Sequence, residues 1–75
     1  MEMVILTYNK KTNTYSIPEE YKENNGEKLE IERVFLNGEF CDKRLYVFFD
    51  RWTICFDVKL GEDTIVTAIV KSLND

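Results

Sequence analysis

Residues 45–72, LYVFFDRWTICFDVKLGEDTIVTAIVKS, decide the fold, because three apolar runs in this stretch are separated by two short polar turns. Val, Ile, Phe and Tyr recur in the runs, and these residue types favour a pleated, half-buried surface. Successive side chains of a strand point to opposite faces of a sheet. The stretch therefore predicts three antiparallel strands that share one apolar face, joined at Asp50-Arg51 and at Gly61-Glu62-Asp63.

Counting back from the two turns gives an expected register. Phe49 falls opposite Trp52 and Val47 falls opposite Ile54 across the first turn, and Ile54 falls opposite Val70 across the second. Cross-strand neighbours on one face contact each other. This register predicts a core face that contains Phe49 and Val47, with Trp52 as a structural residue at its end.

The first half of the chain carries further strand signals. Met3–Tyr8 and Thr14–Ile17 flank a polar turn whose last residue, Asn13, is of a type that tolerates a positive φ. Leu29–Leu36 is followed by Asn37-Gly38, the dipeptide that a type I′ hairpin turn favours. These signals predict two hairpin turns and a third long strand.

Two irregular segments are expected between the strands. Pro18 has its φ fixed near the value of a first helical turn, so a short turn of helix should follow Ile17. The Asn37-Gly38 hairpin and the later hairpins disagree about which face is apolar near Lys43. We therefore expect a β-bulge between Cys41 and Leu45, because one extra residue flips the alternation of faces.

Residues 64–73 fit two structures. Their apolar positions match one face of an α-helix, but six of the seven residues from 64 to 70 are β-branched, which favours a strand. The expected fold is therefore all-β, a compact antiparallel meander or small barrel of about six strands in a single domain of residues 1–75. The alternative is an α+β domain, in which a five-stranded antiparallel sheet is covered by a C-terminal helix.

Composition argues against several classes of site. The chain of 75 residues has no His, and its two cysteines, Cys41 and Cys55, lack C-x-x-C spacing, so we expect no metal and no cofactor. Neither cysteine has a histidine as catalytic base, and each of the three glycines lies in a turn, so we expect no enzyme activity. The sequence shows no secretory signal and no apolar stretch of about 20 residues, so we expect a cytoplasmic protein with reduced thiols.

The acidic excess behind the net charge of −4 lies in residues 19–32, which carry six Glu against two Lys. Nucleic-acid-binding surfaces are usually basic, so nucleic acid is not the expected partner. An acidic segment suits a basic protein surface. We therefore predict that Glu19, Glu20 and Glu23 bind a partner, together with Arg51, which stands beside Trp52 at an exposed turn.

The face opposite the expected core also carries apolar side chains. In the expected register, this face holds Tyr46, Phe48, Ile65 and Ile69. Because a solvated sheet face is normally polar, we predict that these four residues form the interface of a homo-oligomer. Cover by another part of the same chain, such as the helical turn after Ile17, is the alternative.

These observations favour binding without catalysis. We expect an intracellular protein that binds a protein partner as an inhibitor or adaptor, of the sort that phages and other small mobile elements encode. One alternative is an oligomer that sequesters a small ligand or nucleotide in a pocket between subunits. A further alternative is a small barrel that binds nucleic acid, against which the missing basic patch argues.

Overall fold

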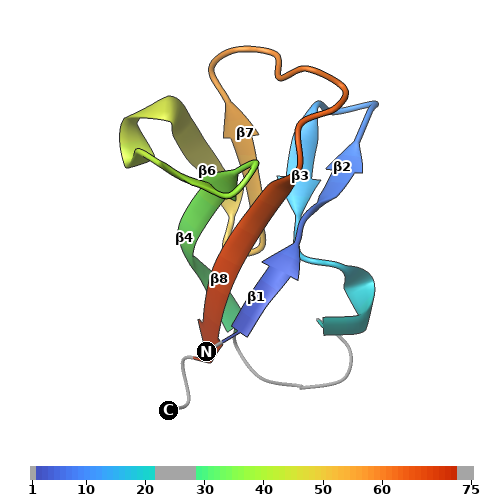
Figure 1. Cartoon of the computed structure of the whole chain (residues 1–75). Helices are drawn as coiled ribbons and strands as arrows, with labels where there is room; N and C mark the ends of the chain where they lie inside the picture. The colour runs from blue at the N-terminus through green and yellow to red at the C-terminus, as the bar shows by residue number, and fades with distance from the viewer. Residues whose placement is uncertain (1, 22–28, 73–75) are drawn as a thin grey trace.

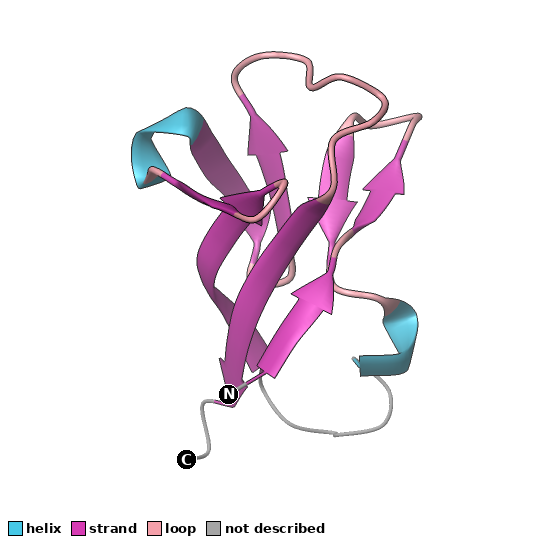
Figure 2. Cartoon of the chain, in the orientation of Figure 1, coloured by secondary structure: helices cyan, strands magenta, loops and turns pink. Residues whose placement is uncertain are grey.

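The chain folds into two four-stranded antiparallel sheets with one apolar core between them (Figures 1 and 2). The structure is a computed structural model that describes residues 2–21 and 29–72. Sheet A has the strand order β1-β8-β4-β5, and sheet B has the order β2-β3-β7-β6. The elements are β1 Glu2–Ile5, β2 Thr7–Asn9, β3 Thr14–Ser16, β4 Leu29–Leu36, β5 Glu39–Cys41, the 3-10 helix η1 Lys43–Leu45, β6 Tyr46–Asp50, β7 Thr53–Phe56 and β8 Val66–Ser72.

The all-β class predicted from the sequence is confirmed, and the C-terminal segment is the strand β8 rather than a helix. The described strands form two sheets and not a closed barrel, which was one of the two expected forms, and there are eight of them where about six were expected. A helical turn follows Ile17 at residues 19–21, as predicted. Its first hydrogen bond runs from the N–H of Tyr21 to the carbonyl of Pro18, over 3.0 Å.

The expected first strand is divided at Leu6, where the chain passes from one sheet to the other. β1 belongs to sheet A and β2 to sheet B, and Figure 1 shows them as successive parts of one bent strand. The Leu6 side chain is buried, and its N–H donates to the carbonyl of Val66 over 2.9 Å. Burial of this apolar residue between the sheets fixes the bend, because its side chain must face the core.

Strand β8 is the centre of sheet A, with β1 on one side and β4 on the other. Ala68 lies opposite Val4 in β1 and opposite Val34 in β4. All three side chains are buried, so this row forms the inner face of the sheet. The predicted pairing of residues 52–58 with β8 is therefore wrong: β7 instead pairs with β3 and β6 in the other sheet.

The hairpin of β6 and β7 exists as predicted, but its expected register is wrong by one residue. Tyr46 lies opposite Phe56 and Phe48 opposite Ile54, and the register shifts between Phe48 and Asp50. This extra residue next to the turn reverses the alternation of faces. Tyr46 is therefore buried in the core, whereas the Phe49 side chain, which was expected in the core, is 74% exposed.

The turn at Asn37-Gly38 has the predicted geometry, with φ of 50° and 85° at its two residues. Phe35 pairs with Phe40 across it, as expected. The Asn37 side chain also accepts a hydrogen bond of 2.8 Å from the N–H of Ile65, which ties the hairpin to the start of β8. Asn13 likewise has a positive φ of 55° at the end of the first hairpin turn, which confirms its predicted role.

The irregular segment predicted after Cys41 is a 3-10 turn and not a β-bulge. Asp42 precedes η1, and its carboxylate accepts a 2.8 Å hydrogen bond from the N–H of Arg44. A hydrogen bond of this kind satisfies a main-chain donor at the start of a helical turn. The hairpin that begins at β4 therefore stops at Cys41, and η1 carries the chain from sheet A to sheet B.

The core is built by both sheets and is largely aliphatic, with an aromatic cluster on the side of sheet B. Ile17, Val34 and Ile54 are its most completely buried large side chains. The ring of Phe56 lies 5.4 Å from that of Tyr15 and 5.9 Å from that of Tyr46. Trp52 is partly buried and packs against this core, so its expected contact with the interior is present while its expected partner Phe49 faces solvent.

We predict that Ile54→Ala lowers the free energy of unfolding by about 2–5 kcal/mol, because a fully buried side chain leaves a cavity. A domain of this size is stabilised by roughly 4–11 kcal/mol, so the loss is large. Urea unfolding followed by tryptophan fluorescence measures it. Ile65→Ala, at an exposed position, is the control and should change the stability by less than about 0.5 kcal/mol. Equal effects of the two substitutions would contradict the assignment of the core.

We also predict that Cys41 resists alkylation in the folded protein. Its side chain is buried, and burial followed by the charge of Asp42 raises the pKa of its thiol. The thiolate is the reactive form, so both effects slow the reaction at neutral pH. Mass spectrometry after a short iodoacetamide pulse should find the half-buried Cys55 labelled first, and Cys41 labelled only in denaturant. Equally fast labelling of both thiols in the native protein would refute this.

Candidate interaction surface

The outer face of sheet A carries a largely apolar row of side chains that crosses all four strands. Ile5 lies opposite Thr67, Thr67 lies opposite Phe35, and Phe35 lies opposite Phe40. The side chains of Ile5 and Phe40, at the two ends of the row, are 65% and 63% exposed. The Phe35 and Phe40 rings meet edge to face with centroids 6.1 Å apart. The row is therefore an ordered apolar strip that remains open to solvent in the described part of the chain.

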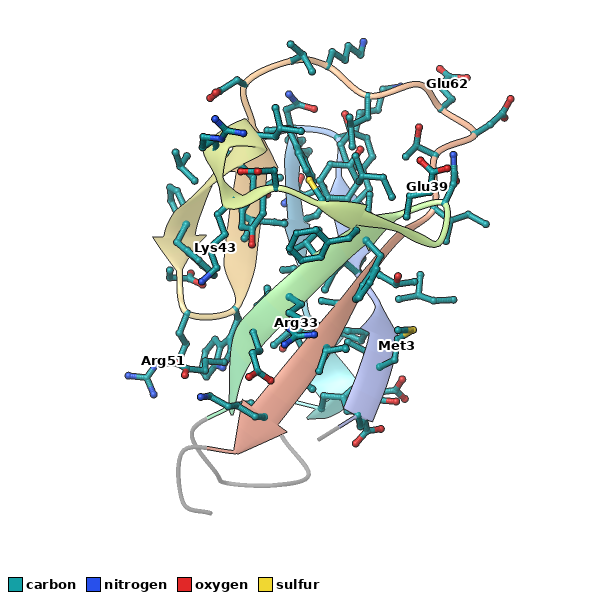
Figure 3. All side chains as sticks on the ribbon, turned by 60° about the vertical axis from the view of Figure 1, so that its left-hand side comes forward. Met3, Arg33, Glu39, Lys43, Arg51 and Glu62 are labelled. Atoms are coloured by element: carbon teal, nitrogen blue, oxygen red, sulfur yellow. The ribbon has the colours of Figure 1, made fainter. Side chains whose placement is uncertain are left out.

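A second row lies beside the first and ends in a cation. Met3 is opposite Ile69, and Ile69 is opposite Arg33. Figure 3 shows the labelled Met3 and Arg33 on the same side of sheet A, with the ribbon of β8 between them. Glu30 and Lys71 form the next rung, with their charged atoms 3.7 Å apart. We call this surface the sheet A face; it comprises Met3, Ile5, Arg33, Phe35, Phe40, Ile65 and Ile69.

This surface follows from two continuous apolar runs in the sequence. Met3–Leu6 and Ile65–Val70 place apolar side chains on both faces of a strand, and such runs are typical of strands covered on both sides. Val4 and Val70 face the core, and the alternate residues face outward. Contiguous apolar patches of this kind mark interaction sites on soluble domains.

Two of the four residues predicted for an oligomer interface lie on the sheet A face, and two do not. Ile65 is exposed just before β8, and Ile69 is half-buried opposite Met3. Phe48 is exposed on β6 in the other sheet, and Tyr46 is buried in the core. The structure therefore does not bring the four together, because β7 and β8, which were expected to pair, lie in different sheets.

The predicted partner-binding residues are placed at two neighbouring segments. Glu19 and Glu20 are exposed on the helical turn, and Glu23 lies outside the described residues. Arg51 is exposed at the turn between β6 and β7, with its guanidinium 6.0 Å from the centre of the Trp52 ring. The N–H of Ile17 donates to the carbonyl of Trp52 over 2.9 Å, so the helical turn begins beside the Arg51 turn.

A cavity of about 620 Å³ opens between the first hairpin and the loop before β8. The Tyr8 and Tyr15 rings lie 4.8 Å apart, and the Tyr8 hydroxyl donates to the side chain of Asn13 over 2.9 Å. Burial, and then the neighbouring Tyr8, raises the pKa of Tyr15, so its hydroxyl stays protonated. The sequence did not indicate this cavity, since residues 59–64 read only as a turn. Its lining is Tyr8, Lys10, Asn13, Tyr15, Lys59, Leu60, Gly61, Glu62 and Thr64.

Within residues 2–21 and 29–72, no cluster of three or more Cys, Asp or Glu side chains could hold a metal ion. In the same residues, no helix has the length and apolar character needed to cross a membrane. Cys41 is buried in the core and Cys55 is half-buried in β7, and neither forms a disulfide.

Comparison with known proteins adds no assignment to this geometry: no family model matches the chain, and searches of curated proteins and of solved structures found no significant match.

Proposed function

We propose that this chain is a non-enzymatic binding protein that docks onto a partner protein through the sheet A face. The observation that carries the proposal is the outer row of sheet A, in which the exposed apolar side chains of Ile5 and Phe40 flank the half-buried Thr67 and Phe35. Water is displaced from such a surface when a complementary apolar surface covers it, and this release drives association.

Burial of the exposed apolar side chains contributes favourably to the free energy of binding, against which the cost of association counts. Covering the exposed parts of Met3, Ile5 and Phe40 contributes roughly 1–2 kcal/mol for each side chain. Arg33 stands at the edge of the apolar rows, and arginine and aromatic residues are typical of the groups that dominate binding energy. Because the strands already hold the backbone of these residues in place, binding does not also have to order a flexible segment.

The acidic helical turn supports a partner with a basic rim. Glu19 and Glu20 are both exposed, and the chain as a whole carries a net charge of −4. Opposite charges at the edge of an interface increase the rate of association more than the final affinity. We therefore assign apolar docking to the sheet A face and steering to the helical turn.

Substitution of Ile5→Lys or Phe40→Lys should abolish capture of the partner, because each places a charge within the apolar row. The measurement is affinity capture from the native host with the wild-type chain and each variant, with circular dichroism as a check of folding. Val47→Lys is the matched control, since Val47 is exposed on β6 in the other sheet, and it should capture the same partner. Unchanged capture by folded Ile5→Lys and Phe40→Lys proteins would exclude this face.

Reversal of charge at Glu19 and Glu20 to Lys should slow association with the captured partner and leave dissociation nearly unchanged. The wild-type association rate should fall steeply as the salt concentration rises, because exposed charges are screened. Surface plasmon resonance at two salt concentrations measures both rates. If the double variant associates as fast as the wild type at low salt, the acidic turn has no part in binding.

A further inference from the structure

We propose that the edge strand β6 pairs antiparallel with β6 of a second copy of this chain, which joins two copies of sheet B into one continuous sheet. This surface is separate from the sheet A face, and the proposal does not depend on the proposed function. The axis of the pairing passes through Val47.

Strand β6 is an unusually apolar edge. β7 is the only described strand that pairs with it, and β6 is the last strand in the order of sheet B. Val47, Phe48 and Phe49 are consecutive and all exposed, and Leu45 just before them is exposed as well. Proteins usually protect such edges with charges or proline, because an open edge is a template for another strand. The opposite edge of the same sheet, β2, presents Thr7–Asn9 instead.

The main chain of β6 has the correct hydrogen-bonding groups free for such pairing. The N–H of Asp57 donates to the carbonyl of Leu45 over 3.3 Å, so this carbonyl faces β7, while the N–H of Leu45 donates to Asp42 within η1. Along an antiparallel strand, the main-chain N–H and C=O groups of successive residues point to opposite edges. The groups of Val47 therefore also face β7, and those of Tyr46 and Phe48 face the open edge. The register shift follows Phe48, so the segment from Tyr46 to Phe48 remains regular.

A two-fold axis at Val47 gives the main-chain N–H and C=O groups of Tyr46 and Phe48 hydrogen-bonding partners in the second copy. Tyr46 of one copy then lies opposite Phe48 of the other, and each of the two equivalent pairs exchanges two hydrogen bonds. At the axis, Val47 of one copy lies opposite Val47 of the other. These two residues form a non-hydrogen-bonded pair, the type of pair in which opposing side chains come closest. Outside this regular segment, the same arrangement brings Leu45, at the end of η1, towards Phe49 of the other copy, where the register shifts. The exposed apolar side chains of the edge thus gather against those of the second copy, as a two-fold interface requires.

The charges at the two ends of β6 favour the same register. Arg44 lies just before the strand and Asp50 at its end, so the antiparallel arrangement brings Arg44 of one copy towards Asp50 of the other. Arg44 also pairs with Asp42 of its own chain over 3.1 Å, and Asp50 accepts a 2.8 Å hydrogen bond from the N–H of Trp52. Lys43 and Arg51 lie beyond the paired residues.

The nearest alternative register is less complementary. An axis at Phe48 would use the same free main-chain groups, but it would place Tyr46 opposite Asp50 and Leu45 opposite Arg51. Apolar or aromatic groups would then face charged ones, and the contact of Arg44 with Asp50 would be lost. The side chains therefore select the axis at Val47.

The first test is the oligomeric state of the full chain, measured by sedimentation velocity over a range of concentrations. The wild type should show a monomer–dimer equilibrium, and Val47→Lys should weaken the dimer at least about tenfold, because two like charges meet at the axis. Ile65→Lys is the matched control, since the side chains of Val47 and Ile65 are each 55% exposed and Ile65 lies outside sheet B, just before β8. This control should dimerise like the wild type.

The second test fixes the register. In a Cys41→Ser/Cys55→Ser background, Val47→Cys should form an intermolecular disulfide on mild oxidation, because close pairs across an antiparallel ladder meet the distance that a disulfide needs. Phe49→Cys, which faces Leu45, should cross-link much more slowly. A wild type that stays monomeric at all concentrations, or a dimer lost in Ile65→Lys but retained in Val47→Lys, would overturn the proposal. Faster cross-linking at Phe48→Cys than at Val47→Cys would overturn the register.

Discussion

The position of β8 between β1 and β4 is the constraint on which the rest of the structure depends. One face of β8 supplies Val66, Ala68 and Val70 to the core, and its two edges hold the neighbouring strands in place. Alternating β-branched residues let the strand serve both purposes, since they fit a pleated surface and resist helix formation. Without this strand, β1 would lose its partner in sheet A and β4 would keep only the short β5.

Local sequence signals were sufficient to predict those strands and turns whose geometry is set by residues adjacent in the chain. Leu29–Leu36 was predicted with the bounds that the structure shows, and Asn37-Gly38 has the positive φ values that its turn type requires. Pairing between distant strands could not be predicted in this way. By apolar pattern alone, residues 52–58 are as suitable a partner for β8 as β4 is. Only the packing of the two sheets around Ile54 decides which of the two segments pairs with β8.

The same distinction applies to the interaction surface. The sequence indicated that one sheet face would carry apolar side chains outside the core, because the chain has more apolar residues than one core can bury. It could not show which residues share that face, because one residue between Phe48 and Asp50 reverses the alternation along β6. Tyr46 is thus a core residue instead of the expected surface residue, while Ile65 is exposed and Ile69 lies opposite Met3 and Arg33 on the outer face of sheet A.

The contrast between pairings of neighbouring strands and pairings of distant strands has a consequence for the kinetics of folding. The hairpins that join β2 to β3, β4 to β5 and β6 to β7 connect nearby residues, and hairpins form within about 1–10 μs. The pairing of β8 with β1 joins Glu2 to Val70, near opposite ends of the sequence, and proteins dominated by such distant contacts fold slowly. Docking of β8 is then the slow step, during which β1 and β4 expose open edges. Destabilising changes in β8 would prolong this stage and expose the refolding chain to aggregation more than equal changes in the hairpins.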